Sequence, residues 1–523
     1  MNKDMKKHES LEAVTHTHTH GHLKKYYQKV ESIFQNRKKE IVTYSIILII
    51  CIMVCAPLLQ MHISSDTYNF MDLGYFTYPI EYFMKDARLI STFVTYLAGI
   101  LKLPYNVFII IMQILAIIIS AFSIYCVYNA VSKKAKIQGN LPKVLIIMAS
   151  FILIFNCMSL EYLLYAECSI MCLSLLLSIL AAKVFTDEKT NKRSIKAMLI
   201  MILASFCYQG AINIFLPLVM LFLFIDANRK PAKELIKRIL LACGILASVY
   251  LINIAAIYAI NLALGASQQR ISGGILDNLR YFKYIMIDIV MNTLVHNYNL
   301  WPMGVTIISV VGILIILLFQ KKKIRNIVQY LILVIVSFGI CVVSVLFMES
   351  PSLEPRMAMA IGGIVGMSLI YAISINQNKI AKKIITLITI LFFVYNLVNT
   401  IQIYTAHIAT NKIDANMGIA IKYKIEEYEK ETGNKVTKVG YKRDANHRDY
   451  HYGWDKKYSS FGQRAFDNYY CIIEALNYYC DRKFEAVRVD EEVYEKYFAG
   501  KDWQAYSDEQ IVFVEDTMYI CTY

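Results

Sequence analysis

Apolar runs long enough to cross a bilayer recur along this chain, and they constrain its fold more than any other feature. The first run, SIILIICIMVCAPLL, lies within residues 41–59 and follows Lys38 and Lys39. A membrane-spanning helix needs about 20 mostly apolar residues, and a helix satisfies its own backbone groups inside lipid. Of the 523 residues, 57% are hydrophobic and only 18% are charged. The sequence therefore predicts an all-α polytopic membrane protein.

The apolar runs predict about eleven crossings, an odd number that puts the two termini on opposite sides. We expect residues 89–103 to lie in the membrane interface, because this run is too short to cross comfortably and Pro104 ends it. Residues 197–225 are interrupted by the polar CYQG, which favours two short half-helices. The other predicted spans are residues 107–128, 144–160, 162–185, 239–264, 303–319, 327–348, 357–376 and 384–403.

The net charge of +14 indicates membrane orientation rather than nucleic acid binding. Basic residues gather in short loops between apolar runs, as in KKAK, NRKPAKELIKR and KKKIR. Cytoplasmic loops of multi-span proteins are enriched in Lys and Arg. We therefore expect a plasma-membrane protein with a cytoplasmic N-terminus and an extracytoplasmic C-terminus.

Composition divides the chain into three predicted parts. Residues 1–40 form a disordered cytoplasmic tail, whose THTHTHGH stretch is either incidental or a weak metal binder. Residues 41–405 form the membrane domain. In residues 406–523, GIAIKYKIEEYEKETG followed by KVTKVGY predicts a helix, a turn and a strand of a small α/β domain. Its many tyrosines either fill a core or contact sugars, because a flat ring covers the apolar face of a pyranose.

The twelve cysteines do not indicate a disulfide framework. Nine lie in or beside apolar runs, where Cys acts as a small hydrophobic side chain. Cys471, Cys480 and Cys521 lie in the C-terminal part. One disulfide among these three is compatible with the sequence, which does not decide whether it forms.

Ionisable side chains gather in the segments that this topology puts outside. Such groups near a membrane boundary are costly and are candidates for function. Because they share one face of the membrane, we expect them to line a single cavity. They include Asp66, Asp72, Asp86, Arg88, Glu161, Glu167, His296, Glu354 and Arg356, together with the polar Tyr208 and Gln209 of CYQG.

These residues suit transfer of a sugar from a lipid-linked donor. The sequence has no P-loop and no dinucleotide fingerprint, and the residues expected to line the cavity show no His-x-x-x-His and no paired Cys motif. A sugar carried on a lipid phosphate is already activated and already in the membrane, so no nucleotide is needed. A carboxylate serves as a general base for an acceptor hydroxyl, and Arg stabilises a phosphate leaving group.

Four stretches carry a family resemblance. SSDTYNF soon after the first span, KDARLISTFVTYL, SFCYQGAI and EPRM together resemble the bacterial Gtr-type glucosyltransferases, membrane enzymes of the GT-C superfamily. The resemblance covers roughly residues 41–403, whereas the C-terminal part is similar only in position. It implies a polyprenyl-phosphate-linked hexose as donor, with glucose expected, and a cell-surface glycan as acceptor.

The resemblance also implies roles for individual residues. Asp66 is the expected general base, and Asp86 is the expected second catalytic carboxylate, with Asp72 as the alternative. Family members often carry adjacent acidic residues at the first motif, whereas Thr67 follows Asp66 here. The expected substrate-binding residues are Asp72, Arg88, Glu161, Tyr208, Gln209, His296, Glu354 and Arg356.

Each assignment has a structural alternative. Asp66 also suits the N-cap of a helix that begins near Thr67. Arg88 also suits an anchor to lipid headgroups, Tyr208 and Gln209 also suit contacts between helices, and Glu161 and His296 also suit turn and interface positions.

Two other functions share this topology. An outer-leaflet polysaccharide polymerase or ligase would need a larger acceptor groove. A lipid-linked sugar flippase would place ionisable residues within several spans. The predicted spans here contain few ionisable residues. Carboxylates and phosphate are also able to recruit Mg²⁺, although no ligand spacing requires a metal.

Overall fold

The computed structural model describes most of the chain. The described residues are 38–156, 158–187, 192–226, 228, 230–266, 276, 278–280, 303–319, 324–346, 355–376, 378–443, 464–501, 503 and 506–522. The chain divides into two compact units, Met1–Ile50 and Cys51–Tyr523. Within the first unit, residues 38–50 are helical. All contacts given below lie within the second unit.

The prediction of a largely helical chain with several apolar helices of membrane-spanning length is confirmed. In the described ranges, six helices are long and apolar enough to cross a membrane. Ile, Leu and Val side chains remain exposed along these helices, as expected of surfaces that face lipid. The six are Lys38–Leu59, whose last turn is the 3-10 turn η1 (Ala56–Leu59), α4 (Tyr105–Lys134), α6 (Cys168–Asp187), α9 (Ala232–Leu264), Ile324–Cys341 within α12 (Ile324–Leu346), and α15 (Lys379–Thr432).

The remaining predicted crossings coincide with shorter helices, so the count of about eleven stays a prediction. The run expected at the interface forms α3 (Leu89–Ile100), which follows α2 (Ser65–Tyr78). The helix break expected at CYQG is present, because α7 (Lys192–Cys207) ends before Tyr208, whose backbone is extended. The other short elements here are α5 (Asn140–Ile154), η5 (Gln209–Ile214), α8 (Phe215–Phe224), α11 (Met303–Phe319), α13 (Met359–Gly362) and α14 (Ile364–Ile375).

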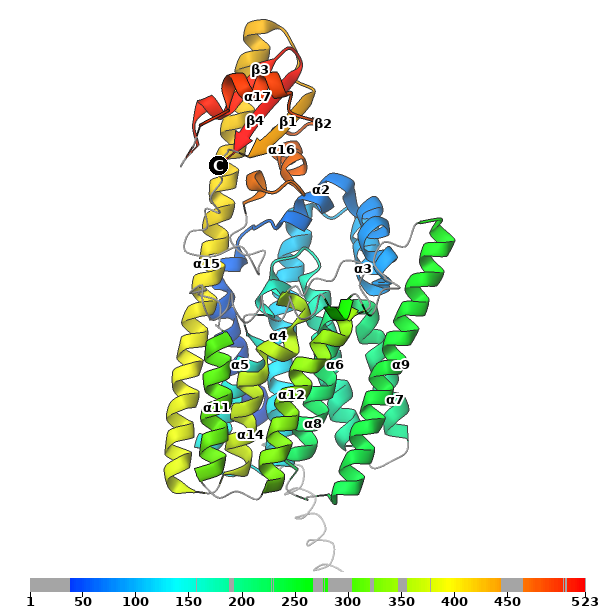
Figure 1. Ribbon diagram of the computed structural model, residues 1–523, viewed down its shortest axis with the longest axis vertical. Helices are drawn as coiled ribbons and strands as arrows, with labels where there is room; N and C mark the ends of the chain where they lie inside the picture. Colours follow the sequence, from blue (N-terminus) through cyan, green and yellow to red (C-terminus); the bar gives the residue numbers. More distant parts are fainter. Residues whose placement is uncertain are drawn as a thin grey trace, which may run out of the picture. The chain divides into compact units, whose positions relative to one another are not determined.

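The apolar helices lie side by side (Figure 1), and a glycine allows close approach in one pair. α4 lies against α5 and α6, α7 lies against α6 and α9, and α5 lies against α14. In the last pair, a Cβ atom at Gly366 would lie 2.5 Å from the backbone nitrogen of Leu153. Small residues allow such backbone approach between membrane helices, where the apolar lipid supplies no hydrophobic drive for association.

The predicted C-terminal sheet is also present. Its strand order is β2-β1-β4-β3, with β1 (Lys438–Arg443) parallel to β2 (Glu485–Val487) and β4 (Thr517–Thr522), and β3 (Ile511–Val514) antiparallel to β4. Helices α16 (Ile472–Cys480) and α17 (Glu491–Tyr497) complete this small α/β structure.

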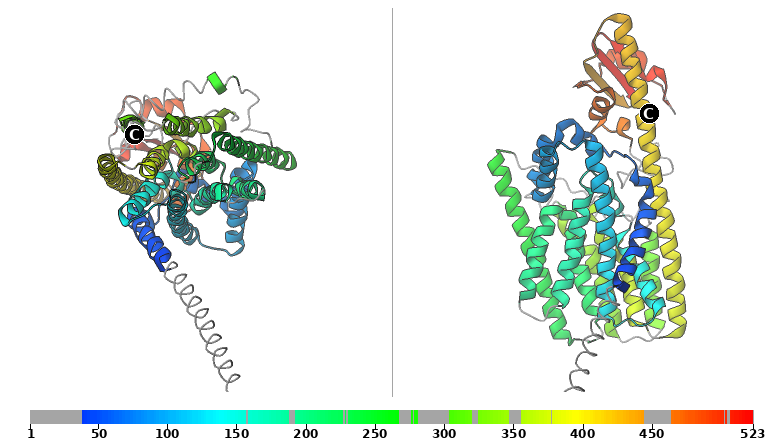
Figure 2. Two further views of the ribbon diagram at one scale, coloured as in Figure 1. Left: turned by 90° about the horizontal axis from the view of Figure 1, so that it is seen from below. Right: turned by 180° about the vertical axis from the view of Figure 1, so that it is seen from behind.

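Helix α15 extends from the membrane region into the C-terminal structure. It runs unbroken across residues 405 and 406, the predicted domain boundary, and continues beside the strands (Figures 1 and 2). Met417, Ile421 and Ile425 of α15 are buried in one core with Val439 of β1 and Ile520 of β4. The C-terminal sheet therefore packs on the same helix that passes through the membrane region. Among the described residues, no disulfide joins Cys471, Cys480 and Cys521 to one another.

We expect Gly366→Ala to destabilise the protein by about 1–3 kcal/mol, the usual cost of overpacking a tight contact. The added methyl group would meet backbone atoms of α5, which have no rotamer through which to move away. Thermal unfolding of the purified protein in detergent measures the effect. Gly244→Ala on α9 is the matched control, because nothing lies within 4 Å of its added Cβ. Equal melting temperatures for the two variants would contradict the packing described here.

Candidate functional site

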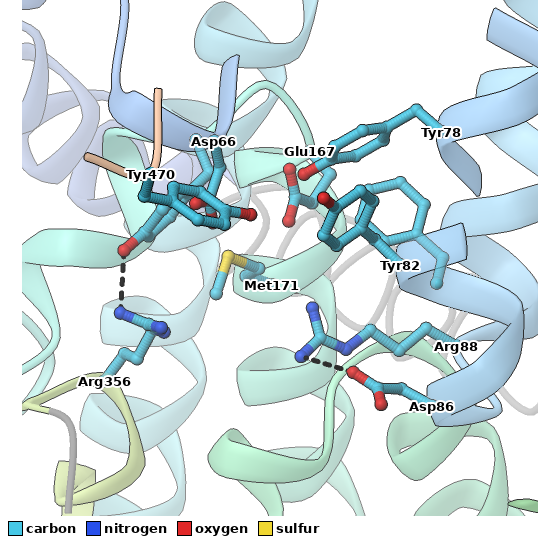
Figure 3. A pocket seen from close by; sticks show the side chains of 11 residues that line it. Asp66, Tyr78, Tyr82, Asp86, Arg88, Glu167, Met171, Arg356 and Tyr470 are labelled. Atoms are coloured by element: carbon cyan, nitrogen blue, oxygen red, sulfur yellow. Dashed lines mark hydrogen bonds and ion pairs between the residues drawn. The ribbon is translucent and has the colours of Figure 1, made fainter. Parts of the chain in front are cut away.

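A polar cavity of about 220 Å³ lies where several helices begin. Its lining combines three carboxylates, two guanidinium groups and four tyrosines (Figure 3). The lining residues are Asp66, Tyr78, Tyr82, Phe83, Asp86, Arg88, Tyr165, Glu167, Met171, Arg356 and Tyr470. They come from distant parts of the chain, which include the C-terminal α/β structure.

Three of the five charged lining residues occupy the starts of helices. Asp66 lies in the first turn of α2, Glu167 directly precedes α6, and Arg88 is the N-cap residue of α3. Helix N-termini carry partial positive charge, so they stabilise the two carboxylates and disfavour the guanidinium group. An arginine at such a position therefore needs carboxylate partners to remain there.

Arg88 has such a partner in Asp86. Asp86 ends the 3-10 turn η3 (Met84–Asp86), and Ala87 then adopts a left-handed conformation with φ of 55°. This sharp turn brings Arg88 Nη2 within 3.3 Å of Asp86 Oδ2.

Two residues of the CYQG segment reach the same place. The Arg88 guanidinium carbon lies 5.0 Å from the ring centre of Tyr208, and Gln209 Nε2 donates a hydrogen bond to the backbone oxygen of Asp86. Four of the predicted site residues, Asp86, Arg88, Tyr208 and Gln209, therefore lie together.

Arg356 is held from a different element. Its Nη1 donates to the Tyr165 hydroxyl at 2.7 Å and lies 3.3 Å from Oε2 of Glu161, which is fully buried in the 3-10 turn η4 (Leu160–Leu163). The Tyr162 hydroxyl donates to the backbone oxygen of Arg356 at 2.8 Å. Glu161 thus fixes Arg356 and does not itself line the cavity.

Glu167 is the acidic lining residue that was not assigned a role from the sequence. Its carboxylate points into the cavity between Asp66 and Tyr78 (Figure 3), and the residue is only 5% exposed. Burial raises its pKa to about 7, an effect that the charge of Arg88 opposes and that of Asp66 reinforces. The predicted topology placed Glu167 at the same face of the membrane as Asp66. The sequence did not indicate that the Glu167 side chain is buried.

The tyrosines that line the cavity were also not predicted as site residues from the sequence. Tyr78 is the clearest example. Burial raises the pKa of Tyr78 well above its ordinary value, and the charges of Asp66 and Glu167 add to this effect. Its hydroxyl is therefore protonated and able to donate a hydrogen bond. The density of aromatics in YFTYPIEYF was the available signal for Tyr78 and Tyr82, whereas nothing in the sequence pointed to Tyr470.

One predicted residue, Asp72, is not part of this cluster. Asp72 accepts a hydrogen bond from Asn477 Nδ2 at 2.9 Å and lies 2.5 Å from Lys483 Nζ, so it joins α2 to the C-terminal structure. His296 and Glu354 lie outside the described residues.

The described ranges contain no group of three or more His, Cys, Asp and Glu side chains arranged to hold a metal ion. The use of Mg²⁺ therefore stays an untested prediction.

Comparisons with known proteins add no relative. No family model, no curated protein and no solved structure matches the chain. The resemblance to the Gtr-type glucosyltransferases therefore remains a hypothesis that depends on the four sequence stretches.

We expect Glu167→Gln to stabilise the protein at pH 8 and to have little effect at pH 5. The ordinary pKa of Glu is about 4.3, so a folded-state value of about 7 means that the folded state holds the proton more tightly. The stability that Glu167 contributes is fully present below its unfolded pKa and is lost as the pH rises through its folded pKa. The neutral amide avoids this loss, which amounts to at most about 4 kcal/mol.

Melting temperatures of the wild type and the variant across pH 5–8 measure this difference. Glu427→Gln, on an exposed position of α15, is the matched control and should give a difference that does not depend on pH. A pH-independent effect of Glu167→Gln would show that Glu167 is ionised throughout.

Proposed function

We propose that the protein is an integral-membrane glycosyltransferase. It moves a hexose, with glucose expected, from a polyprenyl-phosphate donor to a hydroxyl of a cell-surface glycan at the extracytoplasmic face of the plasma membrane. The observation that carries this proposal is the cavity in which Asp66 and Glu167 face Arg88 and Arg356. The cavity belongs to a chain with several apolar spans, which suits a donor anchored in lipid.

The guanidinium groups support binding of the donor phosphate. Arg is well suited to phosphate because its planar fork donates several hydrogen bonds at once. Arg88 and Arg356 approach the cavity from different elements (Figure 3). The Arg88 side chain lines the cavity and keeps 20% of its surface accessible. A phosphate in the cavity would therefore meet guanidinium donors and bring compensating negative charge.

The volume and the tyrosines support a single sugar ring as the transferred group. Ligand pockets usually measure roughly 300–1,000 Å³, so a cavity of 220 Å³ suits one pyranose rather than an oligosaccharide. Tyr78 and Tyr82 are stacked with ring centres 4.6 Å apart, and they form one wall. An aromatic ring presents an apolar face and, in Tyr, a hydroxyl at its edge, which suits the mixed surface of a sugar.

The carboxylates support a single displacement at the anomeric carbon. Asp66 accepts the proton of the acceptor hydroxyl as its oxygen bonds to the anomeric carbon. The bond from that carbon to the phosphate oxygen breaks at the same time, and polyprenyl phosphate leaves with the electron pair, stabilised by the guanidinium groups. The ion pair with Arg88 favours a positioning role for Asp86. Glu167 then becomes the second carboxyl group beside the sugar.

We expect Asp66→Asn to lower the rate of hexose transfer by 100-fold or more, the usual effect of losing a general base. The assay uses membranes that contain equal amounts of each protein and a mixture of radiolabelled polyprenyl-phosphate hexoses. Asp187→Asn, at the opposite end of α6 from Glu167, is the control and should transfer at the wild-type rate. Equal transfer by Asp66→Asn and the wild type would place the base elsewhere.

We expect Arg356→Lys to reduce kcat/KM for the donor at least tenfold, because lysine keeps the charge but loses the planar fork. Arg482→Lys is the matched control, since Arg482 forms an ion pair with Glu429 of α15 and does not line the cavity. Unchanged donor kinetics in Arg356→Lys would remove Arg356 from the phosphate site.

The products of the same assay separate the related functions. Addition of single hexoses to an existing glycan supports the proposal, whereas a ladder of repeat units would indicate a polymerase. Movement of the lipid-linked sugar across the membrane without release of polyprenyl phosphate would indicate a flippase.

A further inference from the structure

Two adjacent tyrosines connect the cavity lining with the C-terminal surface: Tyr470 lines the cavity, and Tyr469 precedes it in the chain. We refer to them as the rim tyrosines. Tyr470 lines the cavity and is 45% exposed, so it is more accessible than the buried lining residues. Tyr469 is 61% exposed. Both belong to the C-terminal α/β structure, whereas most of the lining belongs to the helical region. Tyr470, drawn among the lining side chains in Figure 3, is therefore directly adjacent along the chain to an exposed aromatic residue.

The turn that carries the rim tyrosines is held in place from both sides. The Asn468 side-chain oxygen accepts a hydrogen bond from the Tyr470 backbone nitrogen at 3.0 Å, which is the local bond that favours Asn in turns. The Asn468 backbone oxygen accepts from the nitrogen of Cys471 at 3.1 Å. On the other side, Asn69 Nδ2 of α2 donates to the backbone oxygen of Tyr470 at 3.4 Å. The turn is therefore tied to the helix that carries Asp66.

The Tyr469 ring is also supported, although most of it faces solvent. Its centre lies 4.6 Å from that of Tyr441, and the guanidinium carbon of Arg443 lies 5.0 Å from it. Arg443 is in turn paired with Asp467, with 3.2 Å between Nε and Oδ1. A ring that is already ordered loses little conformational entropy when a ligand binds. Such rigid, amphipathic tyrosines are typical of recognition surfaces.

The chemistry of this surface suits a neutral sugar more than a lipid chain. Among the described residues after Gly433, the exposed large hydrophobic side chains are three tyrosines and one valine, whereas the membrane helices expose mainly Ile, Leu and Val. A tyrosine ring offers a flat apolar face with a hydroxyl at its edge. A pyranose offers the complementary combination of an apolar face and hydroxyls. The four exposed residues are Tyr469, Tyr470, Tyr478 and Val514.

We propose that the rim tyrosines are the acceptor subsite, where a terminal neutral hexose of the surface polysaccharide stacks before it receives the new sugar. The inference rests on the proposed transfer reaction, because it assigns the acceptor to the open side of the same cavity. The guanidinium groups of Arg88 and Arg356 then take the donor phosphate, and Tyr470 marks the boundary between the two substrates. An acceptor hydroxyl that reaches past Tyr470 enters the cavity beside Asp66 (Figure 3).

Footprinting of tyrosines tests this assignment without relying on transfer. Full-length protein in lipid nanodiscs is iodinated for short times, and modification of each tyrosine is measured by mass spectrometry. The probe is total surface polysaccharide from the cells that naturally make the protein, freed of lipid so that no donor is present. We expect the polysaccharide to slow modification of Tyr469 at least threefold. Tyr423 of α15 is 67% exposed and serves as the matched control, whose rate should not change.

Two results would overturn the assignment. One is equal modification of Tyr469 with and without polysaccharide. The other is a Tyr469 that is already as unreactive as Tyr258 of the apolar helix α9 before polysaccharide is added, because the ring would then lie in lipid. Either result is independent of catalysis. A protein that transfers no hexose but shows protected rim tyrosines would contradict the proposed reaction and leave the glycan-binding surface in place.

Kinetics of a variant provide the second measurement. If transfer is observed, Tyr469→Ala should raise KM for the polysaccharide at least tenfold and change kcat less than threefold. Tyr469→Phe, which keeps the ring, should behave like the wild type. A loss of kcat without a change in the acceptor KM would indicate a purely structural role for Tyr469.

Discussion

Two arginines face one cavity because each is held by a carboxylate from its own surroundings. Arg88 is paired with Asp86, and Arg356 is paired with the fully buried Glu161. A guanidinium group removed from water without such a partner is strongly destabilising, and the start of α3, where Arg88 lies, opposes positive charge further. The pairs neutralise part of the charge and leave the guanidinium groups directed at the cavity. Asp66 and Glu167, at helix starts that favour negative charge, complete the arrangement.

Helix α2 connects this charge arrangement to the C-terminal structure. It carries Asp66 in its first turn, and it is attached to the C-terminal side by the hydrogen bond between the Tyr68 and Tyr479 hydroxyls at 2.8 Å. The contact of Asp72 with Lys483 adds a second attachment. Because Tyr470 lines the cavity, the C-terminal structure also contributes a wall. The position of Asp66 therefore depends on residues that lie about 400 positions later in the chain.

The helical membrane architecture could be predicted from the sequence because it follows from local composition. Apolar runs place the helices, Pro104 and CYQG place the breaks, and the alternation in KVTKVGY places β1. The domain boundary at residue 405 was drawn where the composition changes, but α15 continues through it. A helix that leaves lipid and enters a folded domain changes its surroundings without changing its backbone.

The site could be predicted only where a residue type carried its own signal. Asp86, Arg88, Arg356 and the CYQG residues stood out as polar groups beside apolar runs, and the structure brings them together. Asp72 carried the same signal but faces Lys483, because the side of α2 that meets the C-terminal structure depends on tertiary packing. The same limit applies to the burial of Glu167 and to Tyr470, whose importance comes from a contact that no local pattern encodes.

A structure of the protein in lipid nanodiscs with a polyprenyl-phosphonate hexose, a donor analogue whose sugar cannot leave, tests the central claim most directly. The account predicts the phosphonate within hydrogen-bond distance of Arg88 and Arg356, and the hexose between Asp66 and the stacked rings of Tyr78 and Tyr82. Density for the analogue at another place, with the cavity unchanged from the structure described here, would contradict the assignment of this cavity as the site of sugar transfer.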